Sequence, residues 1–216
     1  MDRILYIHGM GGGGDSRIPK ILSEALASEA EVLIRTYDFD PDTGAAQISF
    51  WRDEWQPSLV IGESLGAIQA MRVQGLPHLY VSPSLGAPAR LGLLAPLSLI
   101  PGARWLMNRV WKPREGDRQQ LDFRFSLLRK YPAHGRKALA AATCPGADSA
   151  FAFFGTRDHY RRSGVVSLRA WRKYFGPGSY QLYDGTHFME EEYVRGLLVP
   201  KIREVLAASG LQDPAK

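Results

Sequence analysis

Six apolar runs recur along the chain, and glycine, proline or polar residues bound them. They cover residues 3–8, 31–37, 58–62, 78–82, 150–155 and 180–184. Continuous apolar runs of this length are typical of strands that are buried on both faces of a parallel sheet. Segments of helical character follow the runs, among them residues 44–55, 164–175 and 190–208. The alternation predicts an α/β protein with three layers, in which helices cover both faces of a six-stranded, mainly parallel sheet.

The alternation breaks once, between the fourth and fifth runs, over residues 86–147. Residues 87–145 contain eleven Lys and Arg and three acidic residues, a net charge of +8, whereas the rest of the chain has sixteen basic and nineteen acidic residues, a net charge of −3. Such a length is unusual for a simple connection. We therefore expect one domain, residues 1–216, with a basic helical lid insertion at about 86–147. We expect Trp105 and Trp111 to pack inside that lid.

The motif G-E-S-L-G, residues 62–66, follows the third run directly and precedes a helix. In a strand–turn–helix context, a G-x-S-x-G sequence forms a nucleophile elbow, in which a strained turn exposes the serine hydroxyl. Glycine is needed on both sides because the turn brings the backbones of strand and helix together. Ser64 is therefore the predicted nucleophile, and the backbone N–H of Leu65 is a predicted oxyanion donor. A tight turn without chemistry is the alternative interpretation.

A serine nucleophile needs a base, and the base needs an acid that orients it. Of the five histidines, His187 is the candidate base, because D-G-T-H-F-M follows the last run in a glycine-containing loop. Ligands of open parallel sheets bind at the carboxyl ends of the strands. Asp158 is the candidate acid, since it lies three residues beyond Gly155 at the end of the fifth run, whereas Asp148 precedes that run. The order Ser64, Asp158, His187 is the one expected for this sheet type.

The glycine-rich loop H-G-M-G-G-G-G-D-S, residues 8–16, follows the first run. Its backbone can approach a reacting centre closely, so the N–H of Met10 is the predicted second oxyanion donor, with Gly11 as the alternative. The loop also satisfies the dinucleotide pattern G-x-G-x-x-G, and Asp38 follows the second run as a ribose-binding acid would. Five of the six residues from 9 to 14 are glycine, so that pattern is nearly automatic. A dinucleotide-binding Rossmann-type protein is the alternative prediction.

Four segments together, H-G-M-G, G-E-S-L-G, G-T-R-D and D-G-T-H-F, resemble the α/β-hydrolase superfamily over nearly the whole chain. Among its members, the sequence is similar to the small single-domain esterases of the YqiA type. The resemblance implies a minimal six-stranded sheet in which the first strand lies beside the elbow strand. It also implies Ser64 as nucleophile, His187 as base and Asp158 as acid, with backbone donors at Met10 and Leu65.

These residues predict a serine hydrolase that cleaves a small carboxylic ester through an acyl-enzyme intermediate. A thioesterase, an amidase or an acyltransferase would use the same machinery. A catalytically silent α/β-hydrolase scaffold that acts as a binding protein is a further alternative. Two departures leave the substrate open, namely the long basic insertion and Glu63, where many members of the superfamily have histidine or a small residue. No cofactor and no metal are expected, because no His, Cys and Asp residues cluster at metal-ligand spacing.

The expected partner is a small acyl substrate. One hypothesis is that the basic insertion attracts an anionic substrate, since a cleft of one sign raises encounter rates. No nucleic-acid partner is expected, because no nucleic-acid-binding module accompanies the basic segment. No apolar run is long enough to cross a bilayer, and the single cysteine suits a reducing compartment, so we expect a cytoplasmic protein. We expect that cysteine, Cys144, to be a buried apolar residue, and the oligomeric state stays undetermined.

Overall fold

A computed structural model describes residues 1–210 of the chain, with side chains through residue 208; residues 211–216 of the expected domain lie outside the described part. Its centre is one sheet of six strands in the order β2-β1-β3-β4-β5-β6. Every neighbouring pair is parallel. The strands are β1 (Asp2–Ile7), β2 (Ala30–Ile34), β3 (Leu59–Glu63), β4 (His78–Val81), β5 (Ala150–Gly155) and β6 (Tyr180–Tyr183). The predicted parallel sheet is confirmed, including the pairing of β1 with β3.

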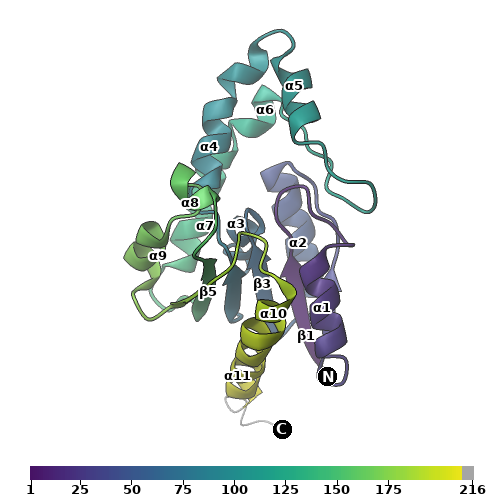
Figure 1. The fold of residues 1–216 in the computed structure, drawn as a ribbon, viewed down its shortest axis with the longest axis vertical. Coiled ribbons are helices and arrows are strands. Elements are labelled where there is room, and N and C mark those ends of the chain that lie inside the picture. The colour runs from purple at the N-terminus through teal and green to yellow at the C-terminus, as the bar shows by residue number, and fades with distance from the viewer. Residues whose placement is uncertain (211–216) are drawn as a thin grey trace.

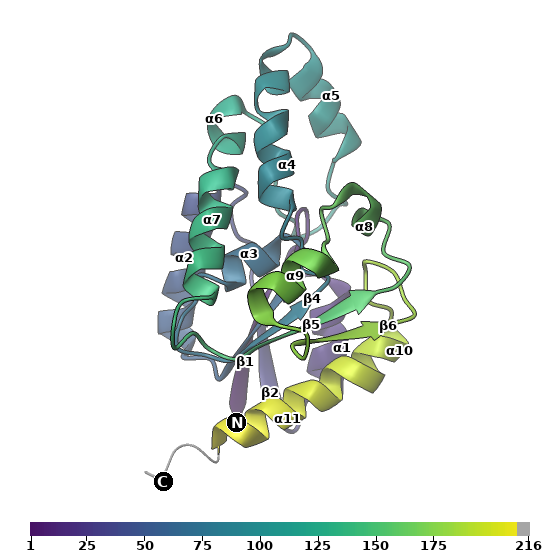
Figure 2. The ribbon, with the colours of Figure 1, turned by 90° about the vertical axis from the view of Figure 1, so that its left-hand side faces the viewer.

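Helices cover both faces of this sheet (Figures 1 and 2). Side chains alternate between the faces along each strand, as the pleat requires: in β1, Leu5 and Ile7 belong to one buried cluster, and Ile4 and Tyr6 belong to the other. The first cluster includes residues of α2 (Pro41–Trp55), α3 (Gly66–Ala70), α7 (Tyr131–Ala142) and α9 (Leu168–Phe175). The second includes residues of α1 (Arg17–Ala25), the π-helical turn Val194–Leu198 and α11 (Val199–Gly210). The three-layer α/β architecture expected from the sequence is confirmed.

Two helix boundaries differ from the predicted ones, and local capping explains both. The helix expected from residue 44 begins at Pro41, because the Asp40 side chain accepts hydrogen bonds from the N–H groups of Asp42 and Thr43. The helix expected over residues 164–175 begins only at Leu168, because a separate short helix, α8 (Tyr160–Ser163), ends at Gly164 in a left-handed conformation, with φ of 73°. After it, α9 begins behind Ser167, whose hydroxyl accepts from the N–H of Ala170.

Residues 86–147 form several short helices between β4 and β5. They comprise α4 (Ala87–Leu94), a 3-10 helix (Pro96–Leu99), α5 (Ala103–Val110), α6 (Phe125–Leu128) and α7. In Figure 1, α4, α5 and α6 stand above the sheet, at the end of the molecule opposite both labelled termini. By contrast, α7 contacts α2 and α3 and contributes buried residues to one face of the sheet. Only the first part of the expected insertion therefore lies beyond the sheet, and α7 belongs to its covering layer.

Predictions about three side chains of this insertion are wrong. Trp105 does not pack inside the lid, because it is 63% exposed on α5. Trp111, at the end of α5, is also exposed, although its ring lies 5.3 Å from that of Phe123. Cys144 is exposed rather than buried, just after the last turn of α7. Among residues 1–210, no helix combines the length and the apolar character that a membrane span requires.

Candidate active site

A sharp turn between β3 and α3 holds Ser64 with φ of 51°, in the left-handed region that costs a residue other than glycine about 1–2 kcal/mol. The neighbouring glycines have no room for a side chain. A Cβ on Gly62 would lie 2.7 Å from the Cβ of Ala70, and one on Gly66 would lie 2.2 Å from the carbonyl oxygen of His8. Gly62 thus lets β3 pass close to α3, and Gly66 lets the start of α3 pass close to the end of β1, so the turn requires both glycines of the motif.

The hydroxyl of Ser64 meets the imidazole of His187, with 2.8 Å between Oγ and Nε2. The other ring nitrogen of His187, Nδ1, lies 2.7 Å from Oδ2 of Asp158. Because a carboxylate only accepts, Nδ1 carries the proton of the neutral ring, and Nε2 is free to accept the hydroxyl proton of Ser64. Asp158 and His187 are only 4% and 2% exposed. The structure thus joins the three candidate residues in one chain of hydrogen bonds at the carboxyl ends of β3, β5 and β6.

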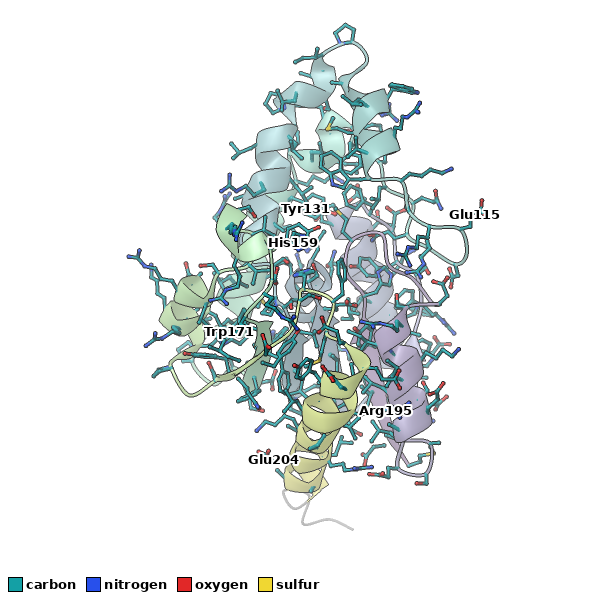
Figure 3. All side chains as sticks on the ribbon, in the orientation of Figure 1. Glu115, Tyr131, His159, Trp171, Arg195 and Glu204 are labelled. Atoms are coloured by element: carbon teal, nitrogen blue, oxygen red, sulfur yellow. The ribbon has the colours of Figure 1, made fainter. Side chains whose placement is uncertain are left out.

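Further contacts fix the acid and the base. The N–H of Tyr160 donates to Oδ1 of Asp158 at 2.8 Å, so both carboxylate oxygens have a partner. The Tyr160 ring stands edge-on to the imidazole of His187, with 4.6 Å between centroids. Gly155 lets the loop that carries His187 approach β5, because a Cβ there would lie 2.3 Å from the carbonyl oxygen of Thr186. His159, another of the five histidines, lies on the exposed turn at α8 (Figure 3).

The two predicted oxyanion donors have free backbone N–H groups. Within residues 1–210, neither Met10 N–H nor Leu65 N–H donates a hydrogen bond to a protein acceptor. The alternative donor, the N–H of Gly11, is already bound to Oε1 of Gln119 at 3.1 Å. The glycine loop also lies against the nucleophile, since a Cβ on Gly9 would be 3.0 Å from the Cβ of Ser64. Met10 and Leu65 therefore remain the better candidates.

The insertion covers the other side of the glycine loop. The N–H of Gln119 donates to the carbonyl oxygen of Gly12 at 2.7 Å, and its Nε2 donates to the carbonyl oxygen of Tyr37. A Cβ on Gly13 would lie 1.8 Å from the carbonyl oxygen of Asp117. Protein backbone thus occupies the place where a dinucleotide phosphate would approach this loop. The strand order also differs from the 3-2-1-4-5-6 order of the Rossmann fold, so the structure does not support the dinucleotide alternative.

A cleft of about 780 Å³ opens beside Ser64. Its walls come from the glycine loop, the start of α1, the His187 loop and the segment after α5. Four basic side chains line it, Arg17, Lys112, Arg114 and Arg118. Its acidic residues are Glu63 and Glu190.

Glu63, the departure from the family pattern, is paired inside the protein. The hydroxyl of Tyr6 donates to Oε2 of Glu63 at 2.8 Å. Burial raises the pKa of Glu63, although this hydrogen bond and the nearby His187 act in the opposite direction. Glu63 ends β3 immediately before the nucleophile, and its carboxyl group is held against Tyr6 of β1. The cleft is therefore not purely basic.

The sequence analysis missed one residue that touches the nucleophile. Oγ of Ser84 lies 3.1 Å from Oγ of Ser64, and the Ser84 side chain is buried. The N–H of Ser84 also donates to the carbonyl oxygen of Ser64 at 3.1 Å. The signal was present, because S-P-S follows the fourth strand at the same edge of the sheet as the other candidates.

His8 is buried, and its contacts support the structure of the glycine loop. Its Nδ1 donates to the carbonyl oxygen of Gly9 at 2.8 Å, and its ring stacks on Tyr37 with 4.4 Å between centroids. Burial lowers the pKa of His8 to about 4, so the ring is neutral near pH 7. In the described part of the chain, no group of three or more His, Cys, Asp and Glu side chains is placed to hold a metal ion.

Comparisons with known proteins show the fold. No protein-family model matches the sequence, and no curated protein matches it. The chain is similar to the solved structure of Est1E from Butyrivibrio proteoclasticus with bound ferulic acid, with a TM-score of 0.67 and 15% identity over 96% of this chain and 90% of that one. It is also similar to mouse alpha/beta hydrolase domain-containing protein 10, with a TM-score of 0.64 and 13% identity over 95% of this chain and 90% of that one.

A third similar structure is a hydrolase of unassigned activity from Agrobacterium vitis S4, with a TM-score of 0.61 and 12% identity over 96% of this chain and 87% of that one. At such identities the likeness concerns the fold alone, and the narrower resemblance to YqiA-type esterases stays a prediction. The sheet, the turn at Ser64 and these similar structures agree. The chain has the α/β-hydrolase fold.

Proposed function

We propose that the protein is a serine hydrolase that cleaves a small carboxylic ester through an acyl-enzyme intermediate on Ser64. The observation that carries the proposal is the unbroken chain of hydrogen bonds from Ser64 through His187 to Asp158. A structural serine turn would not need a buried carboxylate and an imidazole aligned on its hydroxyl. Similar structures support the reaction class, since they include Est1E with bound ferulic acid and a structure described under metagenome-derived lipolytic enzymes.

In the first half of the reaction, Oγ of Ser64 attacks the ester carbonyl carbon while Nε2 of His187 takes the hydroxyl proton. The carbonyl oxygen becomes an oxyanion that accepts hydrogen bonds from the free N–H groups of Met10 and Leu65. The tetrahedral intermediate then collapses, and the bond to the leaving oxygen breaks. His187 returns its proton to that oxygen, so an alcohol leaves and the acyl group stays on Ser64.

In the second half, water takes the place of the alcohol. Nε2 of His187 removes a proton from the water as it attacks the acyl carbon, and the same proton then passes to Oγ of Ser64. A carboxylic acid leaves, and the free enzyme is restored. Asp158 accepts from Nδ1 throughout, which holds the productive tautomer and stabilises the imidazolium that forms in each half.

The choice of substrate is part of the same proposal. A thioester or an amide would fit the same machinery, and we place the ester first because the fold is similar to that of a structure whose description names lipolytic enzymes of lipase and esterase families. We also propose that the substrate carries a negative charge. In the part of the chain that the structure describes, Lys112 and Arg114 line the cleft without an ion-pair partner. The role of α4 to α6 as a lid and a cytoplasmic location remain parts of this proposal.

A fluorophosphonate probe and a neutral, activated short-chain ester test the proposal. We expect the probe to label the wild-type protein and not Ser64→Ala, and kcat/KM for the ester to fall about 10⁴-fold or more in that variant. Ser23→Ala is the matched control, because Ser23 lies on α1 and its hydroxyl donates only to the carbonyl oxygen of Pro19. Equal labelling of Ser64→Ala would contradict the proposal. A folded wild-type protein without labelling would instead favour a silent scaffold, and quenching of NADH fluorescence would favour the dinucleotide alternative.

A further inference from the structure

The end of the lid exposes an unusual number of large apolar side chains. Six of them are between 54% and 66% exposed, and we call this group the lid-tip patch: Leu93, Leu99, Ile100, Trp105, Leu106 and Val110. Elsewhere among the described residues, only Met1, Phe50 and Phe188 are large apolar residues with more than half of their surface exposed. Six large apolar side chains exposed on three consecutive elements are typical of a binding surface rather than of an ordinary protein exterior.

The patch occupies one end of the molecule. Its residues come from α4, the 3-10 helix and the turn after it, and α5, which together form the top of Figure 1. On α5, Trp105 and Arg109 are one turn apart, as are Leu106 and Val110, so these side chains share one exposed face. Met107 is the residue of α5 that turns inward and is buried.

All charges within this part of the sequence are positive. Residues 64–114 contain six Lys and Arg and no Asp or Glu. Arg109 places its guanidinium over the Trp105 ring, 5.3 Å from the centroid, and it has no carboxylate partner in residues 1–210. Arg104 is paired with Asp122 at 3.2 Å. The next acidic residue along the chain, Glu115, lies on the loop below and to the side of α5 (Figure 3).

We propose that the lid-tip patch binds the surface of an anionic lipid bilayer. Leucine, isoleucine and tryptophan side chains that share a surface with an unpaired arginine, Arg109, have the composition of segments that lie in the headgroup region. Tryptophan is suited to that region because its ring is apolar and its N–H is polar. The arginines meet the negative surface potential of acidic lipids, which attracts each cation near the membrane.

The charges and the arrangement of the patch disfavour protein occupants. A second copy on a two-fold axis would bring the same surface against itself, so Arg109 of each copy, which has no carboxylate partner in the described residues, would face a like charge. A groove on a partner protein would receive a single helical stripe, whereas this patch is divided among two helices and the turn between them. A fluid bilayer accepts side chains that project from several short elements.

Co-sedimentation of the full chain with vesicles tests the proposal. We expect the wild-type protein to bind vesicles of phosphatidylcholine with phosphatidylserine, and to bind phosphatidylcholine vesicles much more weakly. Trp105→Ser should weaken binding to the acidic vesicles about tenfold or more, because the ring no longer enters the interface. Arg109→Ala should weaken it about fivefold.

Two control variants match the chemistry of the change and differ in its place. Phe50→Ser removes an equally exposed apolar side chain from α2, where Phe50 is 62% exposed. Arg136→Ala removes an exposed arginine from α7, away from the tip. Both controls should bind the acidic vesicles as the wild-type protein does. Circular dichroism and hydrolysis of the neutral ester verify that each variant is folded.

Three results would overturn the proposal. The first is a wild-type protein that stays in solution with both kinds of vesicle. The second is a loss of binding in the control variants equal to that in Trp105→Ser. The third is a dimer in light scattering that Trp105→Ser dissociates, which would identify a second copy as the occupant. If the first result is accompanied by retention of the protein on polyglutamate, the occupant would be an acidic protein. None of these results depends on whether Ser64 is the nucleophile.

Discussion

The carboxyl edge of the sheet buries polar side chains, whereas the lid tip exposes apolar ones. At the sheet edge, the carboxylate of Asp158 is buried, and each of its oxygens accepts a hydrogen bond. At the lid tip, Trp105 and Leu99 are exposed although they are large and apolar. A buried carboxylate without hydrogen-bond partners would destabilise the fold, so this chain itself must supply the donors to Asp158. The apolar side chains of the lid tip are not covered by the described part of the chain, so their role depends on what binds them.

Among the variants that test this comparison, replacement of the acid Asp158 should cause the largest loss of activity. In Asp158→Asn, the side-chain amide would present a donor to Nδ1 of His187, which would favour the tautomer with the proton on Nε2. That tautomer cannot accept the proton of Ser64. We expect kcat/KM for the neutral ester to fall about 10⁴-fold, because the same change lowers kcat by about that factor in a chymotrypsin-type triad.

Asp184→Asn is the control for that experiment, because Asp184 follows β6 on the same side of the sheet but has an exposed side chain. It should keep its activity within a few-fold of the wild-type value. Should Asp158→Asn behave in the same way, the acid would have to be reassigned, and the sheet edge would no longer be the complete, buried site described above.

Most of the sheet edge could be predicted from the sequence because strong local constraints act there. A parallel sheet fixes where each strand ends, so residues just after β3, β5 and β6 must meet at one edge. Gly62 and Gly66 mark the turn at Ser64, since no other residue fits between strand and helix. Asp158 and His187 could be placed because each of them follows a strand that ends at this edge of the sheet. Whether these residues act as a catalytic triad is the part that the ester assay decides.

Ser84 escaped prediction because a single serine after a strand has no distinctive pattern, and its contact with Ser64 depends on the backbone of two loops. We expect Ser84→Ala to lower kcat about tenfold with KM nearly unchanged, because its hydroxyl can donate to Oγ of Ser64 as negative charge develops there. The control is Ser98→Ala, whose hydroxyl donates to the carbonyl oxygen of Ala95 far from the site. A change in KM alone would assign Ser84 to substrate binding instead.

The lid could not be predicted to the same depth. Its length indicated an insertion, but the direction of Trp105 depends on how short helices pack, and helical periodicity does not determine that. We expected a buried ring because apolar side chains are usually covered within their own chain. We also expected α7 to belong to the lid, but its buried Tyr131 and Ala138 join the core beneath one face of the sheet. Sequence patterns describe single elements better than the surfaces between them.

The smallest expected effect concerns the two cations that link the lid to the cleft. Lys112 and Arg114 follow α5 and line the cleft, so they belong to the lid in sequence and to the site in space. If they attract a carboxylate on the substrate, Lys112→Ala and Arg114→Ala should each lower kcat/KM for a carboxylate-bearing ester about threefold to fivefold. The value for a neutral ester should not change, and added salt should reduce the difference between the two substrates.

Lys137→Ala and Arg136→Ala on α7 are the controls, because they remove the same charges from a surface outside the cleft. Equal losses in the control variants would mean that the net charge of the protein, rather than the position of two residues, sets the preference. Equal hydrolysis of both esters by the wild-type protein, at all salt concentrations, would remove the anionic substrate from the proposal and leave the hydrolase intact. In that case the basic residues after α5 would belong with the lid tip, as part of the surface that meets an acidic membrane.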